Sequence, residues 1–146
     1  MRALLPFLAV FIAGIGLAIQ PPTNASLAKA SGSVALAALI SFAVGTVLLL
    51  AVWFFFNRGD PSALRTAPWW GWFGGLYGAF FVAAFAFAAP RIGLSVALML
   101  AIASQIVTAL LLDHFGLLGL KVALMSWVKL AGAALVLAGV VLVRLG

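Results

Sequence analysis

Two amide side chains and two prolines stand together at residues 20–24 (Gln-Pro-Pro-Thr-Asn), where the first apolar run of the chain ends. Because proline lacks a backbone N–H and fixes φ, Pro21 and Pro22 predict a break or kink in the helix just before them. Carbonyls one turn earlier then lose their partners, and Gln20 and Asn24 could bind a polar cargo there, as broken helices do in transporters. Alternatively the helix simply ends and the motif is an exposed turn. The preceding run spans roughly 24 Å of a core about 30 Å thick, which places Gln20 near one face.

A second set of polar side chains lies within the fourth apolar run. Gln105 and Thr108 are three residues apart and Ser104 and Thr108 are four apart, so a helix places them on one side. Such residues commonly form hydrogen bonds between membrane helices, and the alternative is a ligand site that faces a pore. Tyr77, the only tyrosine, lies in the third run. We include Gln105, Thr108 and Tyr77 with the two amides of the first run as candidate substrate-binding residues.

Charged and titratable side chains occur near the ends of the runs. Asp113 and His114 form the only acid–base pair, and they either mark an interfacial helix end or act as a gate or proton-handling pair. Lys129 lies seven residues into the fifth run, where its ammonium could reach the interface or attract an anion. There is no Glu, and neither Asp lies at the middle of a run. No carboxylate is therefore placed to bind a cationic drug or a proton inside the membrane.

The composition excludes several classes of site. With no Cys, one His and two acidic residues, the chain lacks a nucleophile–base or metal-ligand constellation, and we expect no catalytic residue, metal or cofactor. The eight Lys and Arg residues are spread singly, so they form no basic stripe that could follow a nucleic acid. The protein is predicted to be neither an enzyme nor a nucleic-acid binder.

The elements that position these residues are predicted to be membrane-spanning helices. Apolar residues make up 67% of the chain and charged residues 7%, against about 45–50% and roughly 25% in a soluble domain. So few charges cannot cover the outside of a soluble protein, whereas hydrocarbon permits apolar outward faces. The partner that surrounds this protein is therefore a lipid bilayer.

Five apolar runs are long enough to cross a hydrocarbon core, which takes about 20 helical residues. They cover approximately residues 4–20, 34–56, 69–89, 92–112 and 122–143. The sequence predicts an all-α bundle of five transmembrane helices that forms one domain over residues 1–146, without β-structure. Breaks are expected near residues 57–68, 89–91 and 113–121.

The basic residues give a weak orientation signal. Five spans put five of them on one side of the membrane and three on the other: Arg2, Arg58, Arg65, Lys121 and Lys129 against Lys29, Arg91 and Arg144. This bias favours a cytoplasmic N-terminus. A bias of only two is also what a chain able to insert in either orientation would show.

Several features recur in a fixed order along essentially the whole chain. They are residues 20–25, the glycine-rich third run (Trp72, Gly74, Gly75, Gly78), Gln105, residues 113–116 (Asp-His-Phe-Gly) and the Gly132 and Gly139 pair. In these features the chain resembles the YdcZ-like family of small bacterial inner-membrane proteins in the drug/metabolite transporter superfamily. The resemblance implies a multi-pass inner-membrane protein equivalent to half of the ten-helix members, which consist of two inverted repeats. Those members move amino acids, metabolites, nucleotide sugars or drugs, so the resemblance gives the class and not the cargo.

Two functions stay open from the sequence. In the first, the chain is a subunit of a secondary transporter that moves a small metabolite or amphiphile by alternating access. A lone five-helix unit cannot present mirror-related inward and outward faces, so we expect an antiparallel homodimer, or a heterodimer with a paralogue. The lack of a central acid favours a neutral, zwitterionic or anionic cargo. In the second, the chain is a non-transporting assembly or accessory subunit, and its polar residues need not share a water-filled cavity.

Overall fold

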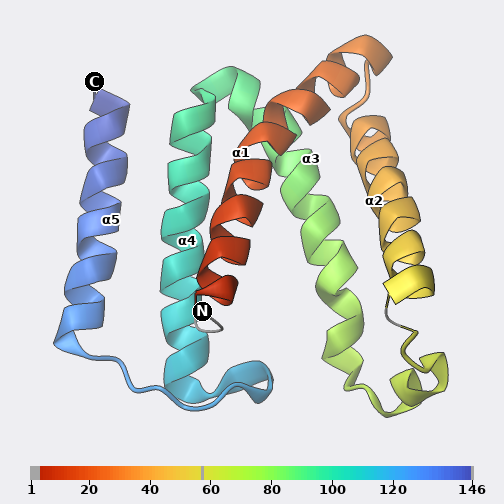
Figure 1. Cartoon of the computed structure of the whole chain (residues 1–146). Helices are drawn as coiled ribbons and strands as arrows, with labels where there is room; N and C mark the ends of the chain where they lie inside the picture. Colours follow the sequence, from red (N-terminus) through yellow and green to blue (C-terminus); the bar gives the residue numbers. More distant parts are fainter. Residues whose placement is uncertain (1–3, 57, 146) are drawn as a thin grey trace. The chain divides into compact units, whose positions relative to one another are not determined.

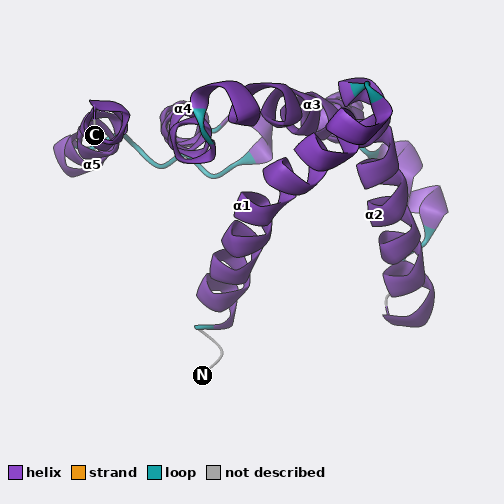
Figure 2. Ribbon diagram, turned by 90° about the horizontal axis from the view of Figure 1, so that it is seen from above, coloured by secondary structure: helices purple, strands orange, loops and turns teal. Residues whose placement is uncertain are grey.

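The computed structural model describes residues 4–56 and 58–145, and five long helices account for most of them (Figure 1). They are α1 (Leu5–Ser31), α2 (Val34–Phe56), α3 (Gly74–Ile92), α4 (Leu94–Phe115) and α5 (Trp127–Leu145). Three short 3-10 helices lie in the connections: η1 (Pro61–Thr66), η2 (Trp69–Phe73) and η3 (Leu117–Gly119). Figure 2 shows helices and loops but no strand among the described residues. The predicted all-α membrane class is confirmed.

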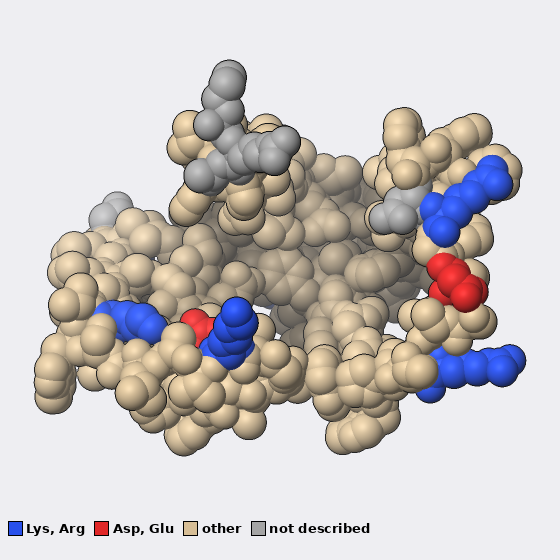
Figure 3. Space-filling view, turned by 60° about the horizontal axis from the view of Figure 1, so that its bottom comes forward, with Lys and Arg blue, Asp and Glu red and all other residues tan. Residues whose placement is uncertain are grey.

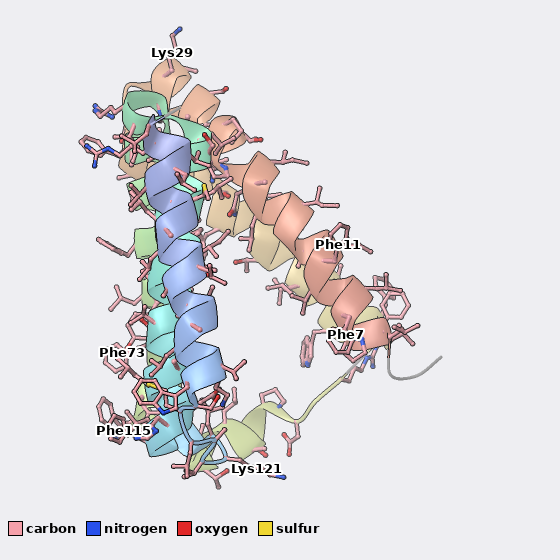
Figure 4. All side chains as sticks on the ribbon, turned by 90° about the vertical axis from the view of Figure 1, so that its left-hand side faces the viewer. Phe7, Phe11, Lys29, Phe73, Phe115 and Lys121 are labelled. Carbon is pink, nitrogen blue, oxygen red and sulfur yellow. The ribbon has the colours of Figure 1, made fainter. Side chains whose placement is uncertain are left out.

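The outward surfaces of these helices are apolar, as hydrocarbon requires. All five, with η2 continuing into α3, are long and apolar enough to cross a membrane. Phe7 and Phe11 project from the N-terminal half of α1 and are 75% and 70% exposed (Figure 4). Charged side chains are few, and most of the face shown in Figure 3 is uncharged. Hydrocarbon around the helices would remove these apolar side chains from water.

The chain divides into two compact units, Met1–Arg91 and Ile92–Gly146. In the first unit, α1 and α2 pack against each other. Their connection is short because Gly32 ends α1 in the left-handed conformation, with φ of 69°, and the Ser33 hydroxyl accepts a hydrogen bond from the Leu36 N–H at 3.2 Å. The two helices are therefore antiparallel (Figure 1). That both units form one transmembrane domain stays a prediction.

The first helix does not end at its two prolines. The predicted span of residues 4–20 is too short, because α1 continues as an α-helix through Pro21 and Pro22 to Ser31. Unwinding here would expose further backbone N–H and C=O groups that hydrocarbon cannot satisfy. The backbone stays α-helical although the two prolines omit two of its hydrogen bonds. Prediction of a helix end or an exposed turn at this motif was wrong.

The third helix also passes a proline. A break at residues 89–91 was expected, but α3 continues through Pro90 to Ile92, and Gly93 alone separates it from α4 with φ of 87°. A glycine adopts this left-handed region at little cost, so it makes the turn. Arg91 secures the end of the helix, because its guanidinium donates to the Phe87 carbonyl and lies 3.7 Å from the centre of the Phe87 ring.

The connection between α2 and α3 lies near its predicted position, although Asn57 and Arg2 fall outside the described residues. Asp60 caps η1. Hydrogen bonds from the Ser62 hydroxyl at 2.6 Å and the Ser62 N–H at 2.9 Å stabilise its carboxylate. These bonds hold the pKa of Asp60 below its usual value. The three tryptophans that follow are exposed, as an interfacial position would require.

In the second unit, α4 packs against α5, and the two helices are antiparallel (Figure 1). The fifth helix begins at Trp127, five residues later than the predicted residue 122. The intervening segment is not helical, and its backbone is bonded to the end of α4: the Ala123 N–H donates to the Asp113 carbonyl at 2.8 Å. An apolar sequence is thus held out of the helix by bonds to a distant part of the chain.

Candidate functional site

The polar motif of α1 presents one buried face. Pro21 is fully buried and Asn24 is only 3% exposed, while Gln20 is half-buried. Hydroxyls on the exposed face form hydrogen bonds with the backbone of the same helix. For example, Thr23 Oγ1 donates to the Ile19 carbonyl at 2.9 Å. Gln20 and Asn24 are four residues apart, so both amides lie on the same side of the helix. The two predicted ligands are therefore turned inward.

On α2, small side chains repeat at every fourth residue. Ala37, Ser41 and Gly45 have this spacing, and Ala37 is fully buried. Small residues let the backbones of two helices approach closely. A Cβ atom added at Gly45 would meet no atom within 4 Å, so the space beside it is open.

A cavity lies where α1 and α2 separate. Figures 1 and 2 show the two helices diverging with distance from their turn. The cavity has a volume of about 180 Å³. The residues that line it carry no charge: Gln20 from α1, and Ser41, Phe42, Gly45, Thr46 and Leu49 from α2. Amide and hydroxyl groups beside an aromatic ring and a leucine suit a small molecule with polar and apolar parts.

Asn24 is the one side chain of the described residues with a fully buried polar atom that has no partner. Its Nδ2 makes no hydrogen bond. A buried polar group left unpaired costs about 1–3 kcal/mol, so native structures rarely retain one without water or a ligand. The prolines add acceptors, because the N–H groups that would bond to the carbonyls of Leu17 and Ala18 are absent. This stretch of α1 therefore combines an amide donor without a partner with two carbonyls that lack their usual helix N–H.

The predicted polar residues of α4 are arranged differently. Ser104 and Thr108 use their hydroxyls on their own helix, with Ser104 Oγ donating to the Ala101 carbonyl and Thr108 Oγ1 to the Ser104 carbonyl, both at 2.8 Å. Gln105 and Thr108 are exposed. They belong to the second unit, so a role together with Gln20 stays a prediction.

Tyr77 lies on α3 and is 67% exposed. The next residue, Gly78, faces α2, because a Cβ atom added there would lie 3.1 Å from Phe42 Cζ. The glycine thus allows α3 to approach the same phenylalanine that lines the cavity. Whether Tyr77 itself binds cargo stays a prediction.

Asp113, His114 and Lys129 contact the backbone of the α4–α5 connection. His114 Nδ1 accepts a hydrogen bond from the Met125 N–H at 3.1 Å. Lys129 Nζ donates to the Leu124 carbonyl at 3.3 Å and the Ala123 carbonyl at 3.5 Å. These bonds give His114 and Lys129 a structural role. The bond from the Ala123 N–H to the Asp113 carbonyl does the same for the backbone of Asp113. The gate, proton-handling and anion-attracting roles stay predictions.

No group of three or more His, Cys, Asp or Glu side chains that could hold a metal occurs within the described residues. The chemistry available at the α1–α2 cavity is recognition by hydrogen bonds and apolar contact.

Comparison with known proteins identifies the family. A family model described as "Putative inner membrane exporter, YdcZ" matches residues 5–142, which is nearly the whole chain. The chain belongs to the YdcZ family. It is 30% identical over 105 residues to the inner membrane protein YdcZ of Escherichia coli K12, a match that covers 70% of each chain. No solved structure matches.

Membership of the YdcZ family confirms the resemblance drawn from the sequence and the multi-pass inner-membrane location. The family description agrees with a transport role and with a non-enzymatic protein. The sequence singled out Gln20 and Asn24 in this YdcZ-family chain but missed Ser41, Gly45 and Thr46. The four-residue spacing of small residues in the second run was the signal that could have found the α2 side of the cavity.

Proposed function

We propose that this YdcZ-family chain is a subunit of a secondary transporter that exports a small metabolite or amphiphile across the bacterial inner membrane. In this proposal the α1–α2 cavity binds the polar part of the cargo. The family description supports export as the direction of transport and the inner membrane as the location. The geometry of α1 supports the location of the site.

The observation that carries the proposal is the unpartnered Nδ2 atom of Asn24. Asn24 lies on an α-helix that continues through two prolines, one turn from Gln20, whose amide lines the cavity. A helix that served only as a membrane anchor would have no use for a buried amide without a partner, since leucine would remove the cost of about 1–3 kcal/mol. A cargo molecule or a water that accepts a hydrogen bond from Asn24 Nδ2 would remove this cost.

The chemistry of the cavity indicates a class of cargo. Amides and hydroxyls without charge favour a group that both donates and accepts hydrogen bonds, attached to an apolar body that contacts Phe42 and Leu49. Neither of the two Asp residues lines the cavity. A neutral, zwitterionic or anionic molecule is therefore favoured over a lipophilic cation, which would need a carboxylate partner.

Alternating access is proposed to arise in an antiparallel dimer. The cavity of about 180 Å³ is smaller than the roughly 300–1,000 Å³ typical of small-molecule sites, so further protein surface is needed to complete it. Two copies related by an axis in the membrane plane would supply that surface and the mirror-related inward and outward faces.

The proposed site is tested by measuring which metabolites cells release into the culture medium. Cells that produce the wild-type chain are compared with empty-vector cells by mass spectrometry of exported metabolites. We expect at least one exported compound in excess, and we expect Gln20→Leu to reduce that excess to the vector level at equal membrane abundance. Ser26→Ala is the control, because Ser26 is exposed and bonds only to the Pro22 carbonyl of its own helix. Unchanged export by Gln20→Leu would contradict the site; no excess from the wild type would favour an accessory subunit.

The assembly is tested by labelling. The sequence has no cysteine, so a single cysteine fused at either terminus gives a clean signal. In an antiparallel homodimer, an impermeant thiol reagent should label about half of each terminus from outside whole cells and the other half only after permeabilisation. One-sided labelling of each terminus would exclude dual insertion and leave a parallel dimer or an oppositely oriented paralogue.

A further inference from the structure

The second unit carries an apolar groove between α4 and α5 that the proposed transport site does not use. Its volume is about 930 Å³. Val96, Leu100 and Ala103 line it from α4, and Leu137 and Val140 line it from α5. Arg144, in the last turn of α5, is the single charged residue of the lining. We propose that this groove binds one anionic phospholipid, with an acyl chain along the groove and the phosphate at Arg144.

The length of the groove fits an acyl chain. Val96 and Ala103, and likewise Leu137 and Arg144, are seven residue steps apart, or about 10 Å of helix. One leaflet of hydrocarbon is about 15 Å deep, half of a core of roughly 30 Å. The groove therefore runs inward from the helix ends through most of one leaflet, which is the depth that a lipid tail occupies.

The charge of the groove selects the headgroup. Arg144 lies at the end where α4 begins and α5 finishes, as its neighbours in the lining show. Asp113, the one acidic side chain among the described residues of this unit, stands at the opposite end of α4. A guanidinium forms paired hydrogen bonds with phosphate oxygens more readily than an ammonium does. An anionic headgroup such as phosphatidylglycerol adds a net charge that a zwitterionic headgroup lacks.

The other polar residues of this unit lie away from the groove. Gln105 is on the far side of α4, about 200° around the helix from Ala103, and it does not line the groove. His114 and Lys129 bond to the connection at the other end of the unit. The groove thus presents a dry channel with one cation at its mouth, and this inference does not depend on the transport proposal.

The proposal is tested by native mass spectrometry of the full chain, purified in mild detergent and titrated with phosphatidylglycerol or phosphatidylcholine of identical acyl chains. Wild-type protein should retain one phosphatidylglycerol about tenfold more strongly than phosphatidylcholine, and Arg144→Gln should abolish that preference. Lys121→Gln, which removes an exposed cation outside the groove, should keep it. Leu137→Trp should weaken retention of both lipids by filling the groove.

Three results would overturn the proposal. Equal retention of the two lipids by the wild type would show that no anionic headgroup is selected. An unchanged preference in Arg144→Gln would show that the net charge of +6 attracts the lipid without a site. Oxidation of Leu137→Cys in native membranes would give a disulfide-linked dimer if a second copy, and not a lipid, covered the groove.

Discussion

The two helix hairpins, α1–α2 and α4–α5, differ in whether their polar side chains have hydrogen-bond partners within the chain. In α4–α5, His114 and Lys129 bond to the backbone of the connection, and the space between the helices is apolar up to Arg144. In α1–α2, Asn24 is buried with Nδ2 unpartnered, and Gln20 lines a cavity. The second hairpin uses polar groups to fix its own shape. In the first hairpin the buried Nδ2 of Asn24 has no partner, and we propose that cargo or water supplies one.

The largest effect is expected at Asn24. Asn24→Leu removes the unpaired amide, so the thermal midpoint in detergent should stay unchanged or rise, while export should fall about five- to 150-fold, equivalent to roughly 1–3 kcal/mol. Export per inserted molecule and thermal unfolding are measured together. A loss of stability in parallel with export would show that Asn24 is a structural residue like those of the second hairpin, and the contrast between the hairpins would fail.

A smaller effect, on stability alone, is expected at the turn that ends α4. Gly116 has φ of 61°, and a Cβ atom there would lie 2.7 Å from Val122 Cγ2 and 3.3 Å from the Leu120 carbonyl oxygen. Gly116→Ala should therefore lower the free energy of unfolding by about 1–3 kcal/mol. Gly132→Ala is the matched control, because Gly132 lies within α5 and a Cβ atom there meets nothing within 4 Å. Equal effects of the two substitutions would mean that the α4–α5 connection does not depend on the left-handed turn at Gly116.

The smallest effect is expected at His114. His114→Leu removes the acceptor of the Met125 N–H and should cost about 1 kcal/mol of stability, the usual contribution of one hydrogen bond. Export per folded molecule should not change. Thermal unfolding and export at two pH values check this; a loss of export at unchanged stability would instead support the gate or proton-handling role of Asp113 and His114.

The sequence predicted the number and type of helices because the length of an apolar run determines whether it can cross a membrane. The second span agrees with α2 at both ends, Val34 and Phe56. The errors lie at prolines: the sequence predicts helix ends near Pro21, Pro22 and Pro90, whereas α1 and α3 continue through them. In hydrocarbon a helix that omits one or two hydrogen bonds is less costly than one that unwinds, and side-chain donors nearby can bond to the carbonyls.

The site was predictable only in part. Gln20 and Asn24 stood out because polar residues are rare in this sequence, but Ser41 and Thr46 looked like ordinary members of an apolar run. The partners of His114 and Lys129 could not be predicted, since the Met125 N–H is 11 residues from His114 in the chain. Which polar groups already have hydrogen-bond partners depends on tertiary contacts, and that distinction separates the proposed binding residues from those that bond to the backbone of the chain.

The central claim is that the α1–α2 cavity is open to water and the surrounding helix faces are not. Because the sequence has no cysteine, single substitutions in the full chain report this directly through reaction with a charged methanethiosulfonate, which needs the thiolate and water. Ser41 lines the cavity, whereas Leu48, on the same helix, is an apolar side chain that is 64% exposed and does not line it. We predict rapid labelling of Ser41→Cys in native membranes and little labelling of Leu48→Cys. Equal and slow labelling of both variants would mean that the cavity is dry, and it would contradict the account.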